Sequence, residues 1–116
     1  MQFDVEIVLR DRIDAVTEHV EHGTEPMGWR EADVDTVLKQ ILLAINRVKN
    51  PSEGGRHIAL RGFSWIVEPL DDKVVIAIEI PMGAAVAGPF AIERDRLDTM
   101  IRRVIAASAA PSPTIH

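Results

Sequence analysis

Two histidines in the segment from Glu18 to His22 are the side chains best suited to hold a metal ion. His19 and His22 are three residues apart; on a helix such residues share a face, so both imidazoles could reach one ion. The zinc-protease pattern instead has histidines four apart with a glutamate after the first, and this segment does not match it. The competing interpretation is a polar helix end, where histidine favours the negative end of the helix dipole. We therefore predict no metal site and retain His19 and His22 only as a candidate pair.

The other arrangements that could carry chemistry are incomplete. The carboxylate pairs Asp71–Asp72 and Asp33–Asp35 are explained by a turn and by a helix start, where aspartate forms local hydrogen bonds. No serine lies in a G-x-S-x-G motif, and the sequence has no glycine motif for phosphates or dinucleotides. The chain contains no cysteine, which excludes thiolate metal sites and a cysteine nucleophile. We expect no cofactor, and a non-catalytic role is favoured.

One alternative stays open, a small-ligand-binding or enzymatic domain with a pocket between sheet and helices. Its polar groups would come from His57, Arg61 and Glu79. His57 and Arg61 share a strand face only if a strand begins near His57. This alternative predicts that their side chains converge on a cavity, whereas side chains splayed into solvent would remove it.

Composition narrows the class of protein. Of the 116 residues, 47% are hydrophobic and 27% are charged, which is typical of a globular domain and excludes a disordered acidic chain. The net charge of −5 argues against nucleic-acid binding, which needs concentrated lysine and arginine. The longest uncharged run, from Ile80 to Ile92, is too short for a membrane span and contains Pro81 and Pro89. No signal peptide is visible, so we expect a cytoplasmic protein that binds neither nucleic acid nor membrane.

Hydrophobic periodicity predicts the elements that position these residues. Apolar side chains alternate with polar ones from residue 2 to residue 10, which favours a half-buried strand over a helix. Ile13, Val16 and Val20 then recur at helical spacing, so we predict a helix that ends near Gly23. The two candidate histidines would lie on this helix.

Two further helices have clear apolar stripes. The first is predicted from Arg30 to Lys49, with Asp33 as its N-cap. Its stripe consists of Val34, Val37, Leu38, Ile41, Leu42, Ile45 and Val48. The second opens at Glu93, and its stripe consists of Leu97, Met100, Ile101, Val104 and Ile105. Stripes with this spacing are those that a helix packs against a core.

A β-hairpin is predicted from residues 57–68 and 73–80, with Asp71 and Asp72 at its turn. The register that follows has three apolar pairs, Val67 with Ile76, Trp65 with Ile78, and Phe63 with Ile80. All six side chains then share one face, and a slip of one residue would scatter them. A third strand is predicted within residues 86–92.

Together these elements predict an α+β fold, an antiparallel β-meander of three to four strands packed against two or three amphipathic helices. Residues 1–108 are expected to form a single domain. Residues 109–116, rich in alanine, serine and proline, are expected to form a flexible C-terminal tail.

The segment from Ile80 to Phe90 carries no charge. It is either a buried strand that allows close backbone approach or an apolar surface that another chain covers. The second face of the hairpin also carries apolar side chains that two helices would leave uncovered. We therefore predict a non-catalytic protein–protein interaction module that self-associates as a homodimer, with a different protein as the alternative partner. The residues predicted to contact the partner are Ile58, Leu60, Ile66, Ile80, Met82, Val86 and Phe90.

Overall fold

Five strands and two long helices form within the part of the chain that the structure describes. The computed structural model describes residues 1–50 and 60–109. Its elements, in chain order, are β1 (Gln2–Leu9), β2 (Val16–Glu21), a short 3-10 helix η1 (Pro26–Gly28), α1 (Glu31–Lys49), β3 (Ser64–Leu70), β4 (Lys73–Ile80), β5 (Gly83–Phe90) and α2 (Arg94–Ala109). The strands make one antiparallel sheet in the order β2-β1-β5-β4-β3.

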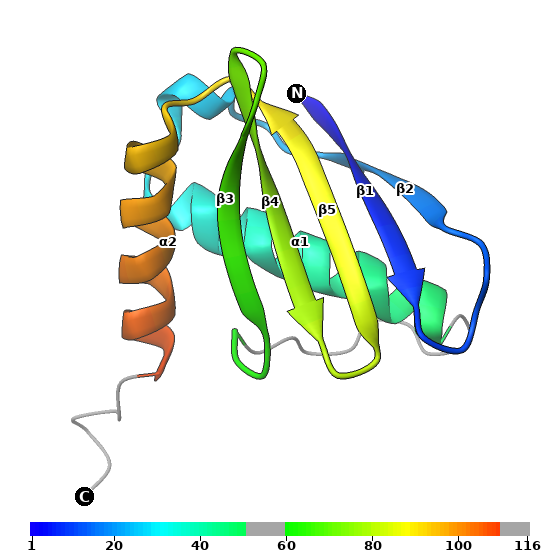
Figure 1. The fold of residues 1–116 in the computed structure, drawn as a ribbon. Coiled ribbons are helices and arrows are strands. Elements are labelled where there is room, and N and C mark those ends of the chain that lie inside the picture. Colours follow the sequence, from blue (N-terminus) through cyan, green and yellow to red (C-terminus); the bar gives the residue numbers. More distant parts are fainter. Residues whose placement is uncertain (51–59, 110–116) are drawn as a thin grey trace, which may run out of the picture.

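This arrangement confirms the α+β prediction, with five strands in place of three or four. Strands β3, β4 and β5 form the predicted meander, and β1 joins the sheet by pairing with β5. Helix α1 crosses one face of the sheet, while α2 lies beside β3 and packs on α1 (Figure 1). Within residues 1–50 and 60–109, no element covers the opposite face, which we call the open face.

The core lies between the sheet and the helices, and both predicted stripes contribute to it. The stripe residues Val34, Val37, Leu38, Ile41, Ile45, Val48, Leu97, Met100, Ile101 and Val104 are all buried. Trp29 is fully buried, and its ring centroid lies 5.0 Å from that of Phe90. The Phe90 ring lies 5.0 Å from Phe3. These aromatic contacts join the first strand, the loop before α1 and the last strand.

The β3–β4 hairpin has the predicted register, with Trp65 opposite Ile78 and Val67 opposite Ile76. Asp71 at its turn has a φ of 56°, a left-handed conformation that aspartate tolerates better than most residues. Strand β3 begins at Ser64, later than the predicted residue 57. Gly62, with a φ of 78°, interrupts the extended backbone just before it.

The helix predicted across residues 13–22 is wrong, because Val16–Glu21 form strand β2. This strand pairs with β1 and places Val20 opposite Phe3. Ile13, which a helical stripe would bury, is 99% exposed. β-branched residues such as Val16 fit a strand at least as well as a helix, and β1 offers its edge for backbone pairing.

The N-cap prediction for α1 is also wrong. Arg30 occupies the N-cap position, and Asp33 lies in the first turn. The Asp33 Oδ2 atom accepts a hydrogen bond of 2.9 Å from the Arg30 backbone N–H. The carboxylate therefore satisfies an amide at the helix start from within the helix.

Some predicted features lie outside the described residues, namely Ile58, His57 and the C-terminal tail from residue 110 onward. Ala109, assigned to the tail, is the last residue of α2. No helix in the described part of the chain combines the length and the apolar character needed to cross a membrane.

Candidate functional site

The open face is formed by the side chains that point away from the helices, every second residue along each strand. Two rows of register partners cross its middle. The first row is Glu6 on β1, Val86 on β5, Ala77 on β4 and Ile66 on β3. The second row is Val8, Ala84, Glu79 and Ser64 on the same four strands. Residues that lie far apart in the chain are thus neighbours on this surface.

The middle of the open face is apolar. Val8, Val86 and Ile66 are 45%, 43% and 53% exposed, with Ala77 and Ala84 between them. The buried face of the same strands carries Val74, Ile76, Ile78, Ala85 and Ala87. An antiparallel sheet with one solvated face normally alternates apolar and polar residues, whereas near-continuous apolar strands are typical of sheets covered on both faces. Strands β4 and β5 have the second pattern.

A hollow of about 360 Å³ is sunk into this apolar region. Its lining includes the small side chains of Ala77 and Ala84, with the larger Ile66 and Val86 beside them and Glu79 also at its wall. On the open face, the larger side chain of Val86 therefore stands beside a hollow that exists because Ala77 and Ala84 have short side chains.

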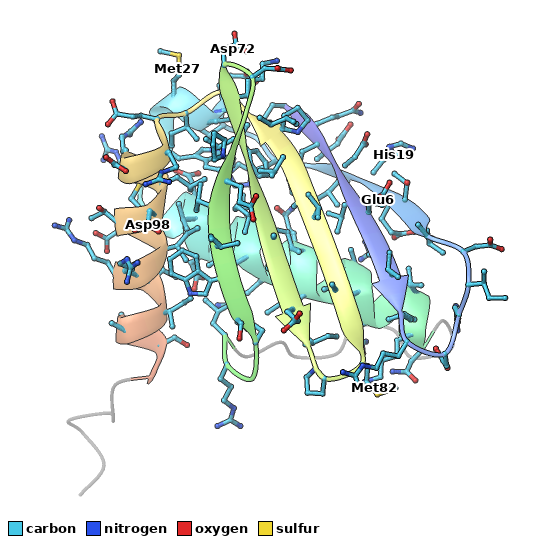
Figure 2. The ribbon with its side chains drawn as sticks, in the orientation of Figure 1. Glu6, His19, Met27, Asp72, Met82 and Asp98 are labelled. Carbon is cyan, nitrogen blue, oxygen red and sulfur yellow. The ribbon has the colours of Figure 1, made fainter. Side chains whose placement is uncertain are left out.

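Charged side chains lie around the apolar middle. Asp4, Glu6, Glu68 and Glu79 are all exposed on this side of the sheet, and Figure 2 shows Glu6 and His19 over β1 and β2. Arg10 follows β1, and its backbone N–H donates to the Met82 carbonyl at 2.8 Å. Arg10 and Glu79 line a second hollow of about 630 Å³, at the end of the sheet next to the β4–β5 turn.

Of the residues predicted for a ligand pocket, the structure describes Glu79 and Arg61. Glu79 lines the hollow of about 630 Å³ with Arg10 and Ser64. Arg61 is exposed and does not belong to that lining. His57 lies outside the described residues, so its convergence with Arg61 stays a prediction.

The two candidate metal-binding histidines have different surroundings. The Nδ1 atom of His19 lies 2.6 Å from Oδ1 of Asp4, and both side chains are exposed. His22 follows β2, with its Nε2 3.0 Å from Asp33 Oδ1 and its ring edge-on to Trp29. They separate because strand residues at odd spacing point to opposite faces. No three His, Asp or Glu side chains among the residues that the structure describes are grouped to hold a metal ion.

The described residues predicted to contact a partner lie in three places: the open face, the β4–β5 end of the sheet and the core. Ile66 and Val86 lie on the open face. Met82 is 40% exposed in the β4–β5 turn, at the lower end of the sheet in Figure 2, and Ile80 is half-buried. Two of the predicted partner contacts, Leu60 and Phe90, are wrong, because their side chains are 2% and 0% exposed.

Local backbone geometry explains both errors. The β4–β5 pairing shifts register between Val74 and Ile76, which pair with Phe90 and Ala87. β5 therefore has one extra residue there, a bulge, and Ala87 and Phe90 both face the core although they are three residues apart. Gly88 between them has a φ of 135°, which a glycine adopts readily. The bend at Gly62 precedes β3 and leaves Leu60 outside the strand, in the core.

Val8, Ala77 and Ala84 form part of the apolar middle of the open face but were not among the predicted contacts. Val8 was detectable as the one apolar residue on the polar side of the alternating first strand. Ala77 was detectable as part of the almost uninterrupted apolar run from residue 74 to residue 80. Their proximity was not detectable, because it depends on β1 pairing with β5.

Comparison with family models, with curated proteins and with solved structures gives no match to this chain.

Proposed function

We propose that this protein is a non-catalytic protein–protein interaction module whose partner is a second copy of the same chain, docked on the open face. The observation that carries the proposal is the apolar character of β4 and β5 on both of their faces. A helix layer accounts for one apolar face. The exposed Val8, Val86 and Ile66 on the other are accounted for by a second layer.

Burial of the open face is favourable on elementary grounds. Apolar surface removed from water contributes roughly 25 cal/mol for each Å². Two sheets stack at a separation of about 10 Å, which suits a face whose centre has short side chains. Ala77 and Ala84 provide such a centre.

A second copy of the chain fits this face better than a polar partner would. Isologous pairing hides the same patch on both subunits, and it is the commonest assembly of small chains. The second copy also brings an apolar surface of the required kind, because it presents the same Val8, Val86 and Ile66.

The test is the molecular mass of the protein in solution as a function of concentration, for the wild type and for Val86→Lys. We expect a concentration-dependent dimer in the wild type. In Val86→Lys the dimer should weaken by more than about tenfold, because a charged ammonium group would have to leave water for the interface. The fold should be retained, since Val86 is 43% exposed in the subunit.

The matched control is Ile13→Lys, the same kind of substitution at a side chain that is 99% exposed in the β1–β2 connection. It should leave the dimer unchanged. A wild-type protein that stays monomeric at every accessible concentration would overturn the proposal, as would equal weakening by both variants.

A further inference from the structure

We infer that the two copies pack about a two-fold axis that runs roughly parallel to the strands, between β4 and β5, so that Val86 of each copy enters the hollow of the other. This inference rests on the proposed self-association and specifies the arrangement at the same face. It follows from the relief of β4 and β5, in which large and small side chains alternate.

Large and small residues face each other across the β4–β5 pair. Val86 on β5 is the register partner of Ala77 on β4, and Ala84 on β5 is the register partner of Glu79 on β4. Each strand therefore has a small side chain where its neighbour has a large one. Facing layers interdigitate when large residues lie over small ones.

An axis along the strands matches large residues with small ones. It places β4 of one copy over β5 of the other, and each residue then lies over the partner copy of its own register neighbour. Val86 then lies over Ala77 of the partner copy, in the hollow of about 360 Å³, and Glu79 lies over Ala84. The strands of the two sheets stay near-parallel in direction, as in aligned sheet packing.

An axis across the strands that runs along the row from Glu6 to Ile66 gives a poorer fit, because every residue of that row would lie over its own copy. Val86 would then meet Val86, the hollow over Ala77 would meet another hollow, and Glu6 would meet Glu6. Such an arrangement combines a packing defect with like-charge repulsion.

The axis along the strands also pairs opposite charges at one end of the sheet. Arg10 and Glu79 line the same hollow next to the β4–β5 turn, and this axis keeps that end of both copies together. With β4 over the partner's β5, Glu79 comes beside the end of the partner's β1, where Arg10 is located. The dimer would contain this ion pair twice.

At the other end the fit is less favourable, since Glu68 comes over Asp4 of the partner. Lys73 starts β4 at this end, and His19 lies 2.6 Å from Asp4. The ammonium group of Lys73 offsets the acidic contact.

Charge reversal in mixed samples tests the arrangement. In Arg10→Glu alone both pairs become Glu–Glu contacts, and in Glu79→Lys alone both become Lys–Arg contacts. We expect either variant to self-associate about tenfold more weakly than the wild type, the scale of two lost exposed ion pairs. In an equimolar mixture, one chain of each kind restores two opposite-charge pairs, so the mixed dimer should form with nearly wild-type affinity, measured by sedimentation equilibrium.

The controls are Arg94→Glu and Asp14→Lys, which make the same charge changes at exposed sites outside the open face and should not give preferential mixed dimers. If a reversal variant does not fold, the milder Arg10→Gln or Glu79→Gln replaces it. Each of these should weaken the dimer by a smaller factor than a charge reversal. A mixture that associates no better than its components, beside a dimeric wild type, would overturn the arrangement and leave the proposed function standing. A wild-type monomer would overturn both.

Discussion

Asp33 joins three parts of the chain through its two carboxylate oxygens. Oδ2 accepts from the Arg30 backbone N–H at 2.9 Å, and Oδ1 lies 3.0 Å from Nε2 of His22. The backbone hydrogen bond from Arg30 is the largest cause that lowers the pKa of Asp33 below its ordinary value of 3.8, followed by the side-chain hydrogen bond of His22. Partial burial acts in the opposite direction but does not outweigh them. The ionised carboxylate is therefore the form that the fold stabilises.

A carboxyl group whose pKa is lowered by folding stabilises the native state above its unfolded pKa. That contribution disappears as the pH falls through the lower, folded value. We therefore expect Asp33→Asn to lower the free energy of unfolding by about 1 kcal/mol at neutral pH, the usual scale for a lost helix-start interaction. The difference between variant and wild type should shrink below pH 3.8, the ordinary value.

Urea unfolding followed by tryptophan fluorescence measures the stability difference at neutral pH and at acidic pH, because Trp29 is fully buried. Asp35→Asn is the matched control, since Asp35 only pairs with Lys39 on the helix surface, at 2.9 Å. That variant should change stability by less than about 0.5 kcal/mol. A difference for Asp33→Asn that is constant from neutral to acidic pH would contradict this account of the carboxylate.

At the residue scale, Asp33 does act at the start of α1, but from the first turn and not as the predicted N-cap. Acidic residues at a helix start indicate a cap, yet the N-cap is set by where the backbone enters the helix. Arg30 has a φ of −113° and a ψ of 178°, so the extended chain ends there and Asp33 falls in the first turn. The contact with His22 could not be predicted, because residues 16–22 were expected to be helical.

At the scale of elements, local signals were sufficient for α1, α2 and the β3–β4 hairpin. The apolar spacing of α1 and the turn at Asp71 are properties of short stretches of sequence. β2 was predicted as a helix because Ile13, Val16 and Val20 recur at helical spacing. Val16 and Val20, four residues apart, also fit one face of a strand. What decides between the two is the pairing with β1, which is a tertiary contact.

The β1–β5 pairing, which brings Val8 next to Ala84, depends on a close backbone approach at Gly83. Gly83 is the register partner of Leu9, and a Cβ atom added to it would overlap the Val8 carbonyl oxygen. We expect Gly83→Ala to lower the free energy of unfolding by about 2–4 kcal/mol, the range for a steric clash that the backbone must relieve.

Chemical denaturation again gives the value, and Gly23→Ala is the matched control. A Cβ atom at Gly23 has no neighbour within 4 Å, so this variant should lie within about 0.5 kcal/mol of the wild type. Similar stabilities for the two alanine variants would mean that the approach of β1 to β5 is not as close as described.

At the scale of the whole molecule, sequence analysis predicted that the chain makes more apolar sheet than its helices cover, but it misplaced part of the excess. Ile66 and Val86 are exposed on the open face, whereas Phe90 and Leu60 are in the core. A bulge and a glycine bend redirect these two side chains. The strand order that makes Val8 a neighbour of Ala84 also involves segments more than seventy residues apart.

The most direct test of the central claim, that a second copy covers the open face, is the reactivity of a thiol placed there. The chain has no cysteine, so Val86→Cys and the control Ile13→Cys each introduce the sole thiol. The account predicts that the rate of maleimide labelling at position 86 falls as the protein concentration rises, while the rate at position 13 stays constant. A labelling rate at position 86 that is the same at every protein concentration would contradict it.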